Sequence, residues 1–324
     1  MLYNILILLA LHIILVSCGS IQKVAVATTG SIIYEASPHI ESETSFESFQ
    51  KGIPGSLKLA EAFWYLKQDD EDSLVSLIKG YTGYAFVVNE TFYLNDKLLD
   101  VDESPHKDQA IINYTKSMQY GMKFLEQNDV PFSMLVEKMK ENDGIKKLLE
   151  SEFSDDLRDL EGVMFTAQSL SCLINLQKDK VSLYAYVPIA KAMYDWVCSK
   201  NPQINHGACD IFYGSYEASR PSMLGGNPKK GKEHFLKAIK NHPYNWLARV
   251  MYIQHYLIPM SDDEGYAQQK EFFEINSRKY HEAIKWNPDQ SYEQRILGDK
   301  RMRLYQMMAL KRFEFIKKND KDLF

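Results

Sequence analysis

The stretch GGNPKKGKE, residues 225–233, comes close to a loop that binds phosphate groups. Gly226 and the pair Gly231 and Lys232 have the G-x-x-x-x-G-K spacing of such a loop. A working loop follows a strand, and its lysine is followed by Ser or Thr, whose hydroxyl binds magnesium. Here Glu233 follows, and its carboxylate would repel phosphate. We therefore do not predict nucleotide binding.

The same stretch has the features of a helix start. Asn227 is a favourable N-cap residue, and Pro228 suits the first helical position, where a backbone N–H is not needed. Gly231 would let a neighbouring helix approach closely, while Phe235 and Ala238 would lie on the buried face. The pattern predicts a helix from residue 228.

Other combinations of reactive side chains are incomplete. Ser48 and Lys51 fit S-x-x-K, but the partner motifs of that class of hydrolase are missing. His281 and Glu282 lack the second histidine of a zinc protease. We predict no catalytic residue and no cofactor, and we expect the protein not to be an enzyme.

Three cysteines lie beyond the N-terminal region. Cys198 and Cys209 could form a disulfide across a helical hairpin if the chain is exported to an oxidising compartment. A metal site made of these two cysteines and His206 is the alternative, but the spacing fits no zinc site, and we predict no metal. Cys172 lies in an apolar run, and we expect it to be a small buried residue.

The composition favours helices and argues against nucleic-acid binding. The 324 residues include only 16 Gly and 11 Pro, so residues that break helices are few. The formal net charge is -5, and acidic and basic residues are spread along the chain. Because nucleic-acid binding needs a concentrated basic face, we expect no such partner.

The N-terminus resembles a bacterial lipoprotein signal. An apolar run from Ile5 to Val16 is shorter than the roughly 20 residues of a membrane span, and it ends in Leu-Val-Ser-Cys, which resembles a lipobox. We expect residues 1–17 to be a signal peptide and Cys18 to carry lipid. No Lys or Arg precedes the run, so an uncleaved anchor or a plain secretory signal are alternatives. The expected location is the periplasm, and Gly19 after the cysteine favours the outer membrane.

The rest of the chain divides into a tether and one domain. The stretch ESETSFESFQ is polar and acidic, and we interpret residues 18–50 as a lipidated tether. The helical pattern follows, and residues 51–324 are predicted to form a single helical-repeat domain.

An aromatic residue, a small or apolar residue and a proline recur at offsets 0, 3 and 8. The three copies are Tyr194, Val197 and Pro202; Phe235, Ala238 and Pro243; and Tyr280, Ala283 and Pro288. In each copy the first two residues share a helix face, and the proline ends the helix. The second helix of a tetratricopeptide repeat has this pattern, with a shorter period. We predict an all-α fold of tetratricopeptide-like helical hairpins that form a compact solenoid or superhelix.

Three stretches resemble the T-component lipoproteins of TRAP transporters. They are SLKLAEAF with LIKGYTGYAFV, FYGSYEASRPSMLGGNPKKGKEHFLKAI, and RMRLYQMMALKRFEFIKKNDKDLF. The similarity covers about residues 45–324, and the block from Tyr213 to Ile239 is its most specific part. Asp69 and Asp70 depart from the pattern, because a proline-containing turn is expected there.

The resemblance implies an all-helical periplasmic protein that associates with the substrate-binding P component of a tripartite, ATP-independent transporter. It further implies a small-molecule ligand, carboxylate-bearing or apolar, a channel through the helical stack, and a homo-oligomer, with a trimer as the expected form. A tetratricopeptide-like scaffold lipoprotein for cell-envelope assembly, without a small ligand, is the alternative function.

Two groups of side chains are candidates for ligand or channel contacts. The first is Tyr213, Tyr216, Ser219 and Arg220, in which an arginine beside phenols could hold a carboxylate. The alternative is that Arg220 pairs with Glu217 or with backbone carbonyls before Pro221.

The second group is Arg249, Tyr252 and Tyr256, which share one helix face next to Trp246. These side chains could line a channel or meet a partner protein, because Tyr, Trp and Arg are enriched at interfaces. Packing between repeats is the alternative.

Overall fold

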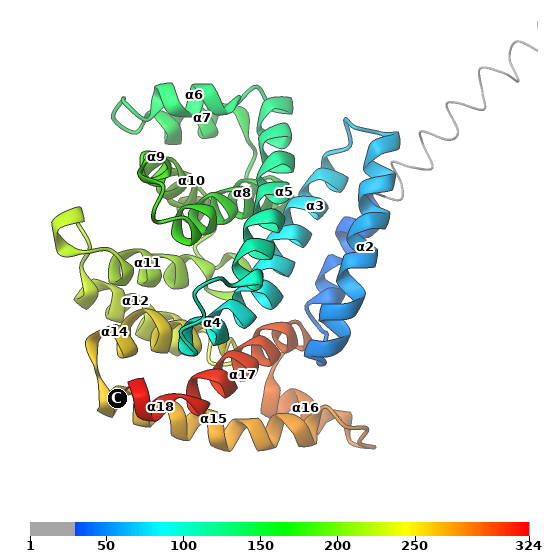
Figure 1. Ribbon diagram of the computed structural model, residues 1–324. Coiled ribbons are helices and arrows are strands. Elements are labelled where there is room, and N and C mark those ends of the chain that lie inside the picture. The colour runs from blue at the N-terminus through cyan, green and yellow to red at the C-terminus, as the bar shows by residue number, and fades with distance from the viewer. Residues whose placement is uncertain (1–29, 324) are drawn as a thin grey trace, which may run out of the picture.

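The computed structural model describes residues 30–323, and every regular element within this range is a helix (Figure 1). The all-α prediction is therefore confirmed for the described residues. The predicted signal peptide, residues 1–17, and the lipidation residue Cys18 lie outside this range. The arrangement as regular tetratricopeptide-like repeats stays a prediction.

A helical segment at residues 30–40 precedes the first long helices. The elements up to the middle of the chain are α2 (Phe46–Leu66), α3 (Glu71–Tyr84), the π-helical turn η1 (Ala85–Asn89), α4 (Glu90–Leu98), α5 (Pro105–Gln127), α6 (Phe132–Lys138), α7 (Gly144–Glu152), α8 (Leu157–Leu176), α9 (Val181–Tyr184) and α10 (Val187–Lys200).

The second half continues in the same way after a short 3-10 turn. Its elements are η2 (Ile204–His206), α11 (Ala208–Ser219), η3 (Ser222–Leu224), α12 (Pro228–Asn241), α13 (Leu247–Tyr252), the π-helical turn η4 (Ile253–Leu257), α14 (Ile258–Met260), α15 (Asp263–Ala283), α16 (Gln290–Leu297), η5 (Lys300–Met302), α17 (Arg303–Lys318) and α18 (Asp320–Leu323).

The tether expected over residues 18–50 is not extended in its described part. Residues 30–40 are helical, and α2 already begins at Phe46, with the side chain of Ser45 accepting a hydrogen bond from the N–H of Ser48. Glu41 is buried against the rest of the protein. The polar composition of this segment reflects an N-cap and an ion pair rather than a solvated linker.

Polar N-caps explain where several helices begin. Asp70, Ser104, Asn227 and Asp262 each accept a hydrogen bond from the backbone N–H three residues later, which satisfies one of the free donors of the first turn. The predicted cap at Asn227 is thus confirmed. The acidic turn that departs from the family pattern has a local role, because its Asp70 begins α3.

Helices α11 and α12 pack closely because glycine lies at the contact. A Cβ atom on Gly231 would stand 2.8 Å from the Cβ atom of Ala218 and 2.9 Å from the carbonyl oxygen of Gly214. Phe235 is fully buried in the same contact and lies against Gly214. The expectation that Gly231 allows close helix approach is confirmed.

The disulfide between Cys198 and Cys209 is present, with the two Cα atoms 5.9 Å apart. It joins the end of α10 to the start of α11 across the turn η2. The third cysteine, Cys172, is only half-buried. It differs from the expected core residue because it lines the central cavity described below.

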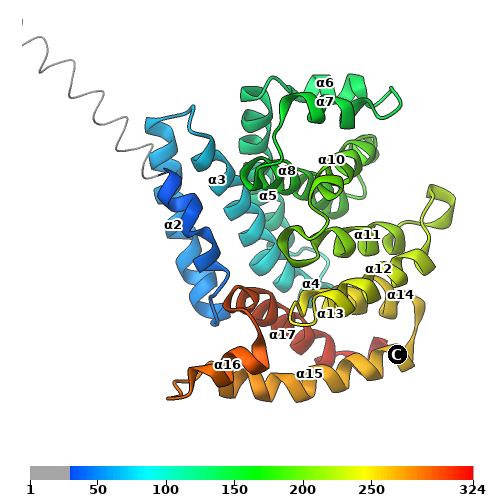
Figure 2. The same ribbon diagram turned by 180° about the vertical axis from the view of Figure 1, so that it is seen from behind.

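The last long helix, α17, returns to the first helices of the chain and closes the stack. In Figures 1 and 2 it lies between α4 and α15 and reaches the lower end of α2. The backbone N–H of Leu304 donates to the carbonyl oxygen of Glu41 over 2.9 Å. The two ends of the described chain therefore hold each other in place.

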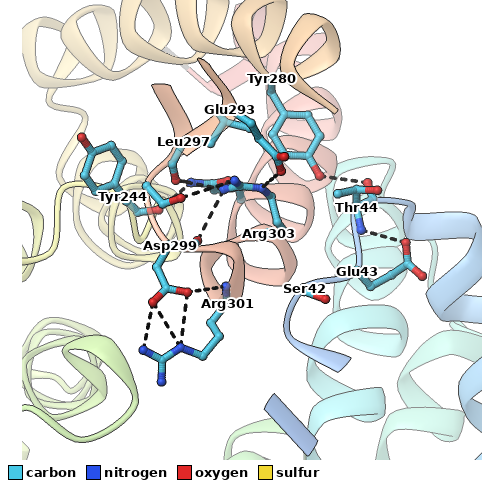
Figure 3. Close-up of polar contacts among 12 residues, drawn as sticks. Ser42, Glu43, Thr44, Tyr244, Tyr280, Glu293, Leu297, Asp299, Arg301 and Arg303 are labelled. Atoms are coloured by element: carbon cyan, nitrogen blue, oxygen red, sulfur yellow. Dashed lines mark hydrogen bonds and ion pairs between the residues drawn. The ribbon is translucent and has the colours of Figure 1, made fainter. Parts of the chain in front are cut away.

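A buried arginine organises this closure (Figure 3). Arg303, only 1% exposed, donates to Glu293 over 3.0 Å and to the carbonyl oxygen of Leu297 over 3.0 Å. Close by, the hydroxyl of Tyr280 donates to the carbonyl oxygen of Thr44 over 2.9 Å. These contacts join α15, α16 and α17 to the segment that leads into α2.

Candidate ligand-binding site

The closed stack surrounds a cavity of about 710 Å³. Its walls come from α2, α3, α8, α10, α11, α13 and α17, and from the helical segment at residues 30–40. Small-molecule sites commonly have volumes of about 300–1,000 Å³, so this cavity is large enough for a ligand. It is the principal candidate site within residues 30–323.

Much of the cavity wall is apolar. Leu57 and Ala60 of α2 line it, together with Ile211 of α11, Met251 of α13 and Met308 of α17. Each of these side chains is less than 9% exposed and belongs to a packed core cluster. An apolar ligand body would therefore be shielded from water by fixed walls.

At one end of the cavity, the positive charge of Lys79 is paired with two carboxylates. The ammonium of Lys79 lies 2.8 Å from a carboxylate oxygen of Glu161 and 3.2 Å from one of Glu41. Burial lowers the pKa of Lys79, but the two carboxylates outweigh this effect and the pKa is raised overall. The hydroxyl of Tyr34 also donates to Glu161 over 3.0 Å. This end therefore offers a ligand no unpaired positive charge from Lys79.

Helix α8 leads from this cluster to the opposite end of the cavity. It begins near Glu161 and ends at Leu176, about 22 Å further at 1.5 Å per residue, and Lys178 follows its C-cap residue Gln177. In Figures 1 and 2, α8 lies in the centre of the molecule, beside α5 and α10.

A stripe of polar side chains on α8 and on the turn that follows it lines the cavity. Gln168, Ser171, Asn175 and Lys178 follow each other at helical spacing and all line the cavity. None of the four side chains has a hydrogen-bond or ion-pair partner among residues 30–323; Gln168 and Ser171 are partly buried, and Asn175 and Lys178 are exposed. We call these four residues the α8 stripe.

Two serine hydroxyls add to the unused polar groups. The Oγ atoms of Ser76 and Ser215 are buried without a hydrogen-bond partner in the described chain, and both residues line the cavity. Because an unpaired buried hydroxyl is unfavourable, such groups at a cavity wall are suited to a polar ligand or to water.

The end of the cavity at Lys178 is electropositive. The imidazole Nδ1 of His255 lies 2.8 Å from the hydroxyl of Ser219. Burial, and then the charges of Arg312, Lys97 and Lys178, lower the pKa of His255 to about 3, so the ring is neutral near pH 7.

A buried arginine contributes to that potential from behind the wall. Arg312 is 2% exposed and donates to Thr91 over 3.0 Å, and also to the carbonyl oxygen of Phe86 in η1 and the side chain of Gln254 in η4. Both elements are π-helical turns, which are rare and frequently occur at functional sites. Glu90, which also lines the cavity, is the nearby carboxylate, and Tyr114 donates to it.

The first predicted group of ligand contacts lies partly at the cavity. Tyr216, Ser219 and Arg220 line it, whereas Tyr213 does not and instead donates to Asp195 over 2.8 Å. The guanidinium of Arg220 lies over the ring of Tyr216 at 3.6 Å and donates to the carbonyl oxygens of Tyr216 and Gly225.

Glu217 stands 3.8 Å from Arg220. These contacts agree with the alternative interpretation, in which Arg220 has structural partners, namely Glu217 and backbone carbonyls. A role in ligand binding stays a prediction for the first group.

The second predicted group lies away from the cavity. Arg249 lies over the ring of Phe272 at 3.7 Å and donates to Gln269, and burial lowers its pKa to about 10. Tyr252 and Tyr256 stack on each other, with ring centroids 5.5 Å apart. None of the predicted three lines the cavity. Their contacts are those of packing between helices, and a role at a partner surface stays a prediction.

Lys232, the lysine of the G-x-x-x-x-G-K spacing, makes a structural contact. The ammonium of Lys232 lies 3.1 Å from Asp262 and 5.1 Å from the centre of the Tyr256 ring. It therefore joins α12 to the start of α15, which agrees with the interpretation of this stretch as a helix start.

Sequence reasoning missed the α8 stripe. The segment is recognisable as a helix with a wide apolar face, and Gln168, Ser171 and Asn175 recur on one side of it at i, i+3 and i+7. This spacing was the available signal. The same spacing also occurs on helices whose polar face meets water, so the sequence could not assign it to a cavity.

A metal site and a membrane-spanning helix are both absent from the described range. Between residues 30 and 323 no three His, Cys, Asp or Glu side chains are grouped as metal ligands would be. No helix in that range combines the length and apolar character of a membrane span.

The architecture defines an all-helical protein with a central ligand-sized cavity. A family model described as TRAP transporter T-component matches residues 42–324 of the sequence. The chain therefore belongs to the TRAP transporter T-component family, whose members are accessory proteins of transport and associate with other TRAP components. No curated protein matches this chain.

Proposed function

We propose that this protein is a lipid-anchored accessory protein of a TRAP-type solute uptake system. In this proposal it docks to the substrate-binding P component and passes or shields a small solute held in its central cavity. The observation that carries the proposal is the cavity of about 710 Å³ inside a chain of the T-component family. Hand-over is passive, because it needs only a walled space and a docked partner.

The proposed location is the periplasmic side of the outer membrane, with lipid on Cys18. The disulfide between Cys198 and Cys209 supports an oxidising compartment. A homo-oligomer, with a trimer as the expected form, is part of the same proposal, and light scattering of the purified protein measures its mass.

The test of docking is a titration of the purified protein against its neighbouring P component by calorimetry. We expect a dissociation constant in the micromolar range or tighter, which corresponds to about -8 kcal/mol. An unrelated periplasmic binding protein is the control. Absence of binding to the P component at tens of micromolar would remove the docking role and favour the scaffold alternative.

The role of the cavity is tested by filling it. Gly83 lines the cavity, and a Cβ atom there meets nothing within 4 Å, so Gly83→Trp places a large side chain in that space. The matched control is Gly52→Trp, at an exposed position of α2 that is equally open. We expect Gly83→Trp alone to abolish solute uptake in cells, with the fold and P-component binding retained.

The lipid anchor is tested by Cys18→Ser. This variant should move from the membrane fraction to the soluble periplasmic fraction, because the acyl chains supply the membrane affinity. Membrane retention of Cys18→Ser would contradict lipidation and favour an uncleaved anchor.

A further inference from the structure

We propose that the cavity binds an amphiphilic anion that carries hydroxyl or amide groups along one side, with its anionic group at Lys178 and its polar side along the α8 stripe. This inference rests on the proposed function in one respect, which is that the cavity holds the solute. It names the chemical class of that solute and the residues that recognise it.

One wall of the cavity has unused hydrogen-bonding capacity. Gln168, Ser171 and Asn175 line the cavity without partners in the described chain, and they cover about 10 Å of α8 at 1.5 Å per residue. Ser215 of α11 contributes a further unpartnered hydroxyl to the lining. A purely apolar molecule bound against this wall would displace water from these groups without replacing its hydrogen bonds, which is unfavourable. A ligand with polar groups at intervals along one side would satisfy them.

The two ends of the cavity differ in charge. At one end, Lys79 is paired with Glu41 and Glu161. At the other end, no carboxylate of residues 30–323 lies within ion-pair distance of Lys178, and Lys97 adds a second cation to the same electrostatic neighbourhood.

The remaining charges at the Lys178 end do not cancel this excess. Lys191 is paired with Asp195 at 2.6 Å, so that pair is close to neutral. The buried charge of Arg312 is offset in part by the charge of Glu90. Lys178 and Lys97 therefore have no ion-pair partner among residues 30–323, and an anionic group is favoured at this end.

Other helices give the cavity an apolar wall. Leu57, Ile211 and Met251 are buried residues of α2, α11 and α13 that line the same cavity. A ligand with an apolar body gains from contact with these walls while its polar groups meet the α8 stripe. Small, fully hydrophilic anions would leave this surface unused.

Cholate is a suitable probe, because it has hydroxyls on one face, an apolar opposite face and a terminal carboxylate. The purified protein is titrated by calorimetry, below the critical micelle concentration, with cholate, with cholanate, which lacks the hydroxyls, and with the cation dodecyltrimethylammonium. We expect cholate to bind about tenfold tighter than cholanate, as one or two hydrogen bonds imply, and the cation not to bind.

Matched variants separate the two parts of the site. Lys178→Gln should weaken cholate and cholanate alike, by about tenfold, because both carry the carboxylate. Lys180→Gln, at an exposed lysine two residues on that does not line the cavity, is the control and should change neither. Asn175→Leu should weaken cholate about fivefold and leave cholanate unchanged.

Three results would overturn the inference. They are binding of the cation as tight as that of cholate, equal affinity for cholate and cholanate in the native protein, and no binding of any probe. Circular dichroism of each variant confirms that it is folded. Because the titrations contain no P component, a failure here is distinct from a failure of docking, which is measured separately.

Discussion

The ammonium nitrogen of Lys79 lies 2.8 Å from a carboxylate oxygen of Glu161, and both side chains are largely removed from water, with 15% and 4% of their area exposed. This contact joins α3 to α8 at one end of the cavity. Glu41, which comes before α2, meets the same ammonium at 3.2 Å. One lysine thus holds three segments that are distant in the sequence.

Removing the charge of Lys79 should strongly destabilise the fold. Lys79→Met leaves Glu161 and Glu41 buried without their counter-ion, and loss of one partner of a buried pair typically costs about 3–5 kcal/mol. Urea unfolding at pH 7 measures the loss. The matched control is Lys51→Met, whose pair with Glu47 is 74% exposed on both sides and should contribute at most about 1 kcal/mol. Equal effects of the two variants would contradict the interpretation.

The stability of the protein should depend on His255 at acidic pH. Burial and neighbouring cations lower its folded-state pKa from 6.5 to about 3. Between these values the unfolded chain binds a proton that the folded chain does not, so the folded state loses stability as the pH falls through this window.

The measurement compares the native protein with His255→Asn, which keeps a polar atom near Ser219. From pH 7 to pH 4 the native protein should lose up to about 3 kcal/mol more than the variant in urea unfolding, since each pKa unit is worth 1.36 kcal/mol. Parallel pH profiles for the two proteins would show that His255 does not titrate in this way.

A methyl group at Gly231 should destabilise the contact between α11 and α12. Its Cβ atom would meet the backbone nitrogen of Ala218 at 2.9 Å, and backbone cannot move aside easily. We expect Gly231→Ala to lower the free energy of unfolding by about 1–3 kcal/mol, as overpacking does.

Gly52→Ala is the control for that variant. Gly52 also lies inside a helix, α2, but a Cβ atom there meets nothing within 4 Å, so alanine should stabilise the protein by about 0.5–1 kcal/mol through helix propensity. The opposite signs of the two changes are the result to check by thermal or urea unfolding. A stabilising Gly231→Ala would refute close packing at α11 and α12.

Loss of the disulfide should weaken the turn between α10 and α11. The bridge closes a loop with a sequence separation of 11, for which the chain-entropy model gives about 3 kcal/mol. We expect the double variant Cys198→Ala and Cys209→Ala to lose about that amount in urea unfolding. Reductant should destabilise the native protein and leave the double variant unaffected. Sensitivity of the variant to reductant would point to another bridge.

Local features could be predicted from the sequence because their causes are local. The N-cap at Asn227 and the close approach at Gly231 both follow from the residue type and its neighbours on one helix. The bridge from Cys198 to Cys209 was one of two open possibilities, and a short separation across a turn made it geometrically accessible. Membership of the T-component family likewise followed from the order of residues in the block from Tyr213 to Ile239.

The candidate site could not be placed in the same way. Arg249 and Tyr252 have the residue types and spacing of a binding face, yet they pack between helices, while Tyr216 and Ser219 of the first group reach the cavity. Helical spacing tells which side chains share a face, but it does not tell whether that face meets water, a helix or a cavity.

The sequence by itself determined the all-helical class, the start of α12 after Asn227 and the family of this protein, since backbone hydrogen bonds and caps depend on residues within a few positions of each other. The tertiary structure alone decided that α17 and the segment at residues 30–40 pack against each other, and that Gln168 and Lys178 line the same cavity. The reason is that a cavity is made by packing between segments hundreds of residues apart, for example Glu41 against Leu304, and no local pattern records that contact.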